Sequence, residues 1–359
     1  MGDLLMSSPA IRALKESFDA KITVLTSSMA RGIAKRIDGI DDVIIYDLPW
    51  IKTDNSIEPE KCLEIIDEIK ARKFDAIIIF SVYCQNPLPA AMLAYLAGVP
   101  RRLAYCRENP YGLLSNWIPD TEPYTEIKHQ VRRDLDLVAA IGAYTRNERL
   151  CLNNNPTDWD SIKDKLLANR IDLTQPWIIL HPGVSERKRE YPFELWIETA
   201  RALASMGYQI LFTGSETEKR LTYKLQQAVN KSFSLAGVLD LNEFIELINR
   251  SPLVISVNTA TIHLAAAVNT PMVVLYALSN PQHFPWKATG KVFLFDVAEE
   301  LKSRNEVITY VNEHFFSKHL PMIKPETIVK AAIDILNGQA EIIPELPECV
   351  LSRTVPSFN

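Results

Sequence analysis

The chain has 359 residues, which is long for one hydrophobic core and typical of two domains. Hydrophobic residues make up 47% and charged residues 23%, as in globular proteins, and the net charge of -5 argues against general nucleic-acid binding. No apolar run reaches the roughly 18 residues of a membrane span, and the start lacks the pattern of a signal peptide.

The chain begins MGDLLMSSPAIRALKES. Ser8 and Pro9 suit the N-cap and the first position of a helix, so a helix is expected there. In an α/β domain, a Gly-Asp turn such as Gly2-Asp3 usually joins the first strand to its helix, yet only one residue precedes this glycine. We therefore expect a first domain without its first strand, an open sheet edge beside residues 21–26 and a poorly held Asp3. A misassigned start or a truncated chain, with a native strand before Gly2, is the expected cause.

Short apolar runs alternate with helical patterns along most of the chain. Strands are expected at 21–26, 42–47, 75–80, 101–105, 177–183, 208–214, 232–237, 252–258 and 271–278. Helices are expected near 59–72, 88–97, 126–142, 192–206, 216–230, 240–249, 260–267 and 324–337. β-branched runs separated by helices indicate parallel strands buried on both faces, so the predicted fold class is α/β with two doubly wound, Rossmann-like halves. The polar segment 152–176 marks the boundary between them.

The predicted domains are 1–155 and 156–323, followed by a C-terminal helix and irregular tail at 324–359. Two such halves place the carboxyl ends of their strands on both sides of one cleft, where ligands bind in this fold class. Candidate site residues should therefore come directly after strands.

Asp3, in the Gly-Asp turn, is the first candidate. Its carboxylate can act as a general base on a sugar hydroxyl, as group transfer requires. It can equally be the cap of the first helix, and the residue type alone does not decide between these roles.

The segment HPGVSERKREYP (181–192) is the second candidate, because it follows a strand and carries Ser185, Lys188 and Arg189. Backbone N–H groups together with a guanidinium make a diphosphate site. The competing interpretation is a solvated basic loop, which is also the default interpretation for Arg101-Arg102 and Arg132-Arg133.

The segment SVNTATIHLAAAVNTP (256–271) is the third candidate, with a strand, an Asn-Thr turn and a helix of small residues. Thr259 or Thr261 can cap that helix, whose free amides attract an anion. His263 can instead be a structural histidine, and close packing explains the alanines.

Missing motifs argue against a nicotinamide-dependent enzyme, a P-loop enzyme and a cysteine zinc site. The motifs G-x-G-x-x-G, G-x-x-x-x-G-K-[ST] and H-E-x-x-H are absent, and none of the five cysteines has C-x-x-C spacing. The Asp134-x-Asp136 pair resembles a metal-binding pair but lies in a helical pattern, so a solvated helix face is the better interpretation. We expect no cofactor and no metal, and the scattered cysteines favour a reducing compartment.

Four segments carry a family resemblance: GDLLMSSPAIRALK, KHQVRRDLDLVAAIGA, WIILHPGVSERKREYPFELWIETARAL and the region from FSLAG to HFPW. In this order they resemble glycosyltransferase family 9, the ADP-heptose:lipopolysaccharide heptosyltransferases, over nearly all of residues 2–286. The resemblance implies a GT-B fold and an inverting, metal-independent transfer of a heptose or related sugar. The implied donor is a nucleotide diphosphate, with ADP as the expected nucleotide.

The resemblance also implies roles for particular residues. Asp3 corresponds to the catalytic base. The family's donor-binding positions fall on Arg189, with Lys188 beside it, on Asn258, Thr259 and Ala260, and on His263. The residue pattern adds Ser185 and Thr261 as donor-binding candidates. Apart from the resemblance, Arg101, Arg102 and Arg107 are basic residues that can meet acceptor phosphates, although the sequence does not show that they share a face. The implied acceptor is a lipopolysaccharide core or another glycan or glycolipid, reached from the cytoplasm with peripheral contact at the inner membrane surface.

The chain departs from the family pattern on the donor side. Arg189 stands where the family has lysine, and the family's D-[ST]-G turn is replaced by Asn258-Thr259-Ala260. A guanidinium still suits a diphosphate, but the carboxylate and the glycine of the turn are lost. A degenerate member that binds sugar nucleotide or glycan without turnover therefore remains the alternative, and a nucleotide-sugar 2-epimerase fits the motifs less well.

Overall fold

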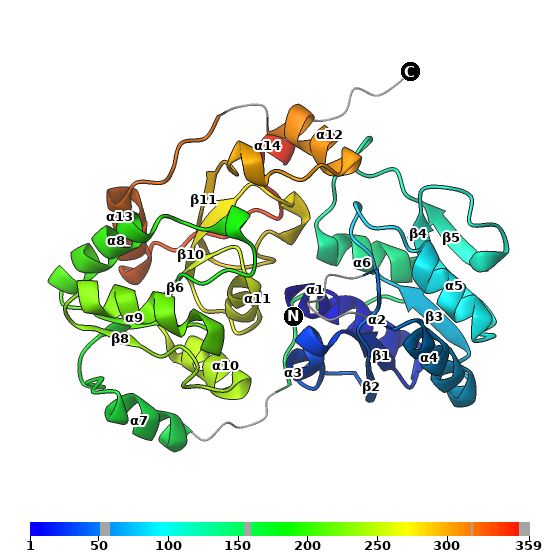
Figure 1. Ribbon diagram of the computed structural model, residues 1–359, viewed down its shortest axis with the longest axis horizontal. Coiled ribbons are helices and arrows are strands. Elements are labelled where there is room, and N and C mark those ends of the chain that lie inside the picture. Colours follow the sequence, from blue (N-terminus) through cyan, green and yellow to red (C-terminus); the bar gives the residue numbers. More distant parts are fainter. Residues whose placement is uncertain (51–57, 154–158, 317–318, 352–359) are drawn as a thin grey trace.

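The computed structural model describes residues 1–50, 58–153, 159–316 and 319–351. These residues form two α/β halves that lie side by side (Figure 1). The predicted boundary at 155/156 falls in 154–158 and lies outside the described residues, as does the end of the predicted tail at 352–359.

The strands of the first half are parallel but belong to two separate sheets. Their bounds are β1 (Thr23–Thr26), β2 (Asp42–Ile45), β3 (Ala76–Ile79), β4 (Arg101–Cys106) and β5 (Asn116–Pro119). β1 pairs with β2 in one sheet, and β3, β4 and β5 form the other in that order. Among the described strands, β1 and β3 each have one unpaired edge, which confirms the open edge predicted beside residues 21–26.

The opening segment differs from the predicted turn. The helices of this half are α1 (Gly2–Met6), α2 (Ser8–Phe18), α3 (Arg31–Ala34), α4 (Pro59–Arg72), α5 (Leu88–Leu96) and α6 (Gln130–Ala139). Gly2 and Asp3 form the first turn of α1, and Ser7 rather than Ser8 is the N-cap residue of α2. The predicted cap was wrong because the Ser8 hydroxyl has another partner: Ser8 Oγ accepts a hydrogen bond from the backbone N–H of Cys151 at 3.1 Å.

The second half contains one sheet of parallel strands. Its members are β6 (Trp177–His181), β7 (Gln209–Phe212), β8 (Ser232–Ser234), β9 (Val254–Val257), β10 (Met272–Ala277) and β11 (Gly290–Phe295). The spatial order is β11-β10-β9-β6-β7-β8, so β6 and β9 lie at the centre. Every residue of β7, β9 and β10 is buried, as expected for a sheet covered on both faces.

The remaining helices belong to the later part of the chain. They are α7 (Trp159–Ala168), α8 (Phe193–Ser205), α9 (Lys219–Ala228), α10 (Leu241–Arg250), α11 (Ala260–Ala267), α12 (Glu306–Phe315), α13 (Pro325–Leu336) and α14 (Glu348–Leu351). The strands β5 and β11 and the helices α7 and α12 were not predicted from the sequence. The tail predicted as irregular contains the short helix α14.

One hydrophobic core runs through both halves. Leu5 and Met6 of α1 are 1% and 0% exposed, and they belong to the same buried cluster as Leu264 of α11. Helix α1 therefore packs against α11 at the junction of the two halves, as Figure 1 shows near the N-terminus.

Helix α6 overturns two predictions of solvated side chains. Arg133 is 2% exposed and Asp134 is 1% exposed. The Arg133 guanidinium donates to the carboxylates of Asp120 and Glu122, and Asp134 accepts a hydrogen bond from Ser7 Oγ at 2.7 Å. Both charged groups are buried because polar partners from other segments satisfy them, which periodicity along one helix does not show.

Candidate active site

The basic loop after β6 lies at the carboxyl end of the second sheet. Lys188 and Arg189 belong to a 3-10 turn over Arg187–Arg189, and both side chains are about three-quarters buried. Lys188 Nζ lies 3.1 Å and Arg189 Nη2 lies 3.3 Å from the same carboxylate oxygen of Glu186. This pairing holds two cations in one place and corrects the interpretation of a freely solvated loop.

Arg189 also reaches the end of the neighbouring strand β9. Its Nη1 donates to the backbone carbonyl of Asn258 at 3.2 Å. Asn258 is the residue before Thr259, which is the N-cap residue of α11. The guanidinium therefore lies beside a helix N-terminus, where unpaired backbone N–H groups already favour an anion.

The turn before α11 is held by the Asn258 side chain. Its Nδ2 donates to the carbonyl of Ala277 at 3.2 Å, and its Oδ1 accepts from the N–H of Ala277 at 3.1 Å. A carboxylate cannot make the first of these bonds, so the amide at this position has its own structural use. Ala260 and Thr261 follow in the first turn of α11.

His263 of α11 lies against the start of the chain. It is 5% exposed, and a Cβ atom placed on Gly2 would come within 2.8 Å of its Cδ2. Only a glycine fits this contact without displacement, so Gly2 brings α1 close to the N-terminal turn of α11.

Asp3 follows Gly2 and carries an exposed carboxylate. The side chain is 79% exposed, and its Oδ1 lies 3.8 Å from Nε2 of His283. This agrees with the expectation that Asp3 is weakly held. His283 Nε2 also lies 3.3 Å from Nδ2 of Asn280.

Three buried polar atoms in this region have no hydrogen-bond partner among the described residues. They are Arg189 Nε, Thr259 Oγ1 and His263 Nδ1. Buried polar groups are nearly always paired, so such atoms call for an explanation. Their common location beside the N-terminus of α11 is what a polar ligand site requires.

Both histidines near Asp3 are neutral at neutral pH. Burial lowers the pKa of His263 well below its ordinary value, and the nearby His283 lowers it further. Burial also lowers the pKa of His283, although Asp3 acts in the opposite direction. The positive charge of the site therefore comes from Lys188 and Arg189.

The other predicted site residues are spread over the molecule. Ser185 is exposed in the loop after β6. Arg101 and Arg102 start β4, whereas Arg107 follows its carboxyl end. The Arg102 guanidinium donates to the backbone carbonyls of Val99, Gly112 and Leu113. The structure therefore does not bring the three arginines together.

Arg107 is the one of these three arginines that follows the carboxyl end of β4. Its Nη2 donates to the carbonyls of Tyr83 and Glu122, at 2.8 and 2.6 Å, and its side chain is 39% exposed.

Sequence reasoning missed Glu186, Asn280 and His283. Glu186 lies inside the basic segment, where its neighbours drew attention to positive charge alone. Asn280 and His283 follow the carboxyl end of β10 in SNPQHFPW (279–286), so the rule that site residues come after strands applied to them as well.

Two structural features are absent from the part of the chain that the structure describes. No group of at least three His, Cys, Asp or Glu side chains there is arranged to hold a metal ion. No described helix is long and apolar enough to cross a membrane.

Solved structures similar to this chain include a glycosyl transferase family 9 protein from Veillonella parvula DSM 2008. It has a TM-score of 0.72 and 18% sequence identity, with 94% of each chain covered. The Escherichia coli ADP-heptose lps heptosyltransferase II has a TM-score of 0.67 and 19% identity, covering 94% of this chain and 96% of the other. These similarities establish the fold.

Sequence comparison gives the same result. Lipopolysaccharide heptosyltransferase 2 of Escherichia coli (strain K12) is 23% identical over 300 residues, which is 79% of this chain and 82% of that protein. Lipopolysaccharide heptosyltransferase 3 of Escherichia coli is 22% identical over 343 residues, covering 93% and 96%. The family profile described as Glycosyltransferase family 9 (heptosyltransferase) matches residues 62–310. Because this match spans more than half of the chain, the protein belongs to glycosyltransferase family 9 and is a glycosyltransferase of the GT-B fold.

Proposed function

We propose that this protein transfers a heptose or related sugar from a nucleotide diphosphate, with ADP as the nucleotide, to a lipopolysaccharide core or similar glycan. Two relatives named lipopolysaccharide heptosyltransferases support the sugar and the acceptor class. A related solved structure described as a heptosyltransferase with ADP supports the nucleotide. Because the proposed acceptor is a membrane glycolipid, we also propose that the protein associates peripherally with the cytoplasmic face of the inner membrane.

One observation carries the proposal: the convergence of Arg189 with the N-terminus of α11, opposite Asp3. Arg189 Nη1 is 3.2 Å from the carbonyl of Asn258, and its Nε is buried without a partner. His263, in the same first turns of α11, lies against the glycine that precedes Asp3. A cationic side chain at a helix N-terminus, close to an exposed carboxylate, suits a sugar diphosphate between two reacting groups.

The proposed reaction is a single displacement at the anomeric carbon. Asp3 takes the proton of the acceptor hydroxyl, whose oxygen forms the new C–O bond from the face opposite the nucleotide. The bond between the anomeric carbon and the diphosphate oxygen breaks, and the diphosphate leaves with the electron pair. Lys188, Arg189 and the α11 amides stabilise that negative charge without a metal, and the configuration is inverted.

On the acceptor side, we propose a role for Arg107. It follows the carboxyl end of β4, and parallel α/β sheets bind ligands at that edge. Its exposed fraction leaves part of the guanidinium for an acceptor phosphate. Arg101 and Arg102, at the other end of the strand, are weaker candidates.

The test is to measure sugar transfer and nucleotide release with ADP-heptose and a truncated lipopolysaccharide acceptor. Asp3→Asn should lower transfer by about 10²-fold or more, the usual contribution of a general base, and leave donor binding unchanged. Asp19→Asn is the matched control, since Asp19 ends α2 in the left-handed region that asparagine also tolerates.

Two results would count against the proposal. Transfer at the normal rate by Asp3→Asn would leave that residue as a helix-terminal acid only. Donor binding without transfer by the unaltered chain would favour a binding protein, the alternative suggested by Asn258 and Ala260.

A further inference from the structure

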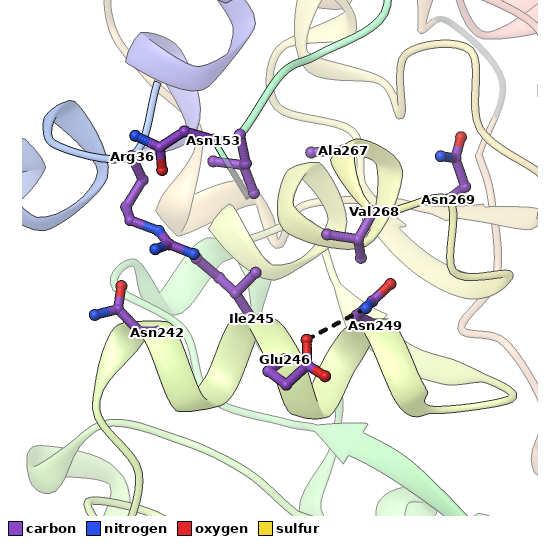
Figure 2. Close-up of a pocket in the computed structure, with 10 residues that line it drawn as sticks. Arg36, Asn153, Asn242, Ile245, Glu246, Asn249, Ala267, Val268 and Asn269 are labelled. Carbon is purple, nitrogen blue, oxygen red and sulfur yellow. Dashed lines mark hydrogen bonds between the residues drawn. The ribbon is translucent and has the colours of Figure 1, made fainter. Parts of the chain in front are cut away.

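A pocket lies between the two halves, with a volume of about 250 Å³. Arg36 and Asn153 of the first half line one side, and α10 and the residues after α11 line the other (Figure 2). The pocket reaches Asn269, at the C-terminal end of α11, whereas the candidate active site lies at the N-terminal end of that helix. The two sites are therefore separated by the length of α11, about 12 Å at 1.5 Å per residue.

Arg36 is the unusual residue of this pocket. It is 7% exposed, yet within the described ranges it has neither an ion pair nor a side-chain hydrogen bond, and its Nε is buried without a partner. Its backbone is fixed, because its carbonyl accepts a hydrogen bond from Asn153 N–H at 2.6 Å. A buried guanidinium without a counterion is costly, and its planar fork suits the oxygens of a phosphate or carboxylate.

The acidic residue of the pocket has its own partners. Glu246 of α10 accepts from Arg250 Nε at 2.6 Å and from Asn249 Nδ2 at 3.3 Å, the bond drawn in Figure 2. It lies in the opposite wall and forms no ion pair with Arg36. Arg36 therefore leaves a positive charge for a ligand.

Asparagine amides supply the remaining polar groups. Asn153 Oδ1 is buried without a partner and can accept a hydrogen bond. Asn242 and Asn249 lie along the exposed side of α10 and line the pocket. Asn269 Oδ1 accepts from Arg149 Nη1 at 2.7 Å, which leaves its Nδ2 as a donor. Amides that both donate and accept hydrogen bonds suit the hydroxyl groups of a sugar.

We propose that this pocket binds a phosphorylated monosaccharide, with the phosphate on Arg36 and the hydroxyls on the asparagines. Its volume lies just below the roughly 300–1,000 Å³ of common ligand pockets, which fits a ligand of one sugar unit. Both halves contribute to its wall, so a bound sugar phosphate would connect them. The proposal does not depend on the transfer reaction.

The test is isothermal titration of the full chain with glucose 6-phosphate, inorganic phosphate and glucose. All variants carry Arg189→Ala, so that binding at the candidate active site is weakened throughout. Glucose 6-phosphate should bind saturably and more tightly than either of the other two probes. Arg36→Met should weaken it at least about tenfold, the loss expected for charge-assisted hydrogen bonds.

Arg31→Met is the matched control, because Arg31 is an exposed arginine at the start of α3. It should leave the affinity unchanged. Asn242→Asp tests the charge without altering a buried residue, since an acid is favourable in the first turn of α10 but repels an anion in the pocket. It should weaken glucose 6-phosphate binding even if Arg36→Met does not fold.

Three outcomes would overturn the proposal. One is the absence of saturable binding of glucose 6-phosphate. Another is equal affinity for inorganic phosphate and glucose 6-phosphate, which would show that the sugar hydroxyls do not contribute to binding. The third is binding that neither Arg36→Met nor Asn242→Asp changes.

Discussion

Lys188 and Arg189 are adjacent residues whose surroundings differ. Both contact Glu186, but only Arg189 also reaches the carbonyl of Asn258 and has a buried Nε without a partner. We expect Arg189→Ala to weaken sugar-nucleotide binding more than Lys188→Ala, with a loss of about 1.5–3 kcal/mol for the charged hydrogen bond. Titration of both variants with ADP-heptose checks this.

Arg187→Ala is the control for this comparison, because Arg187 is exposed in the same turn. It should have little effect. Small and equal losses for all three variants would mean that the loop does not bind the sugar nucleotide.

Asp134 should make stability depend on pH. Burial raises the pKa of its carboxyl from 3.8 to about 7 in the folded chain. Between these values the folded state holds a proton that the unfolded state has released, so the contribution of Asp134 to stability falls as pH rises from about 4 to about 7. Asp134→Asn mimics the protonated form. Between pH 5 and pH 8, the free energy of unfolding of this variant should therefore increase relative to that of the unaltered chain.

Thermal melts at several pH values measure this difference. Asp136→Asn on the same helix is the control, since Asp136 is partly exposed and pairs with Lys128. An equal pH dependence for the Asp134 variant and the unaltered chain would show that Asp134 does not titrate in this range.

At the scale of the elements, Asn258 joins the ends of β9 and β10. Its amide both donates to and accepts from the backbone of Ala277. Asn258→Asp would restore the family's residue, yet it would leave the Ala277 carbonyl without its donor and place a charge at a position 6% exposed. We expect a loss of about 1–3 kcal/mol in unfolding free energy, the cost of an unsatisfied buried group, measured by urea titration.

Asn242→Asp serves as the control for the same chemical change, because Asn242 is exposed on α10. It should be nearly neutral for stability. A stable Asn258→Asp variant with faster transfer would instead mean that the amide limits catalysis.

The edge strands β5 and β11 were among the elements that the sequence pattern failed to predict. β5 contains Asn116 and Pro119, which are rare in strands and tolerated at a sheet edge. β11 begins at Gly290, where a Cβ atom would lie 1.8 Å from the Met272 carbonyl oxygen of β10. The glycine is there because the neighbouring backbone approaches closely, a contact that local periodicity does not encode.

At the scale of the whole molecule, Arg133 holds a buried charge cluster between the halves. It donates to Asp120 and Glu122, and Gln282 of the second half donates to the same Glu122 at 3.1 Å. Arg133→Met would leave the buried Glu122 carboxylate without its cation and would leave Asp120 with Arg107 alone, at 3.9 Å. We expect a loss of about 3–5 kcal/mol in unfolding free energy at pH 8.

The loss should be smaller at pH 6. Burial already raises the pKa of Glu122 to about 7, against the effect of Arg133, so without the cation the carboxylates take up protons more readily. Arg132→Met is the control, because Arg132 forms a partly exposed pair with Glu148 and should cost about 0–1 kcal/mol. A loss independent of pH would contradict this account.

The sequence by itself determined the α/β class, most central strands, and the candidates at strand ends. Runs such as those of β6, β9 and β10 are apolar because both faces of a central strand are buried, and that requirement is local enough to read from neighbouring residues. Lys188, Arg189 and Asn258 could be predicted as site candidates for the same reason. Asn258 directly follows β9, and Lys188 and Arg189 lie in the loop after β6.

Only the tertiary structure decided which side chains meet across the chain. The contact of Gly2 with His263, the bond of Asp134 to Ser7 and the unpaired Arg36 beside Asn153 all depend on segments more than a hundred residues apart in sequence. A charged residue looks the same in a sequence whether water or a distant partner satisfies it. Tertiary packing supplies or withholds that partner, and so decides whether a charged side chain is solvated or belongs to a site.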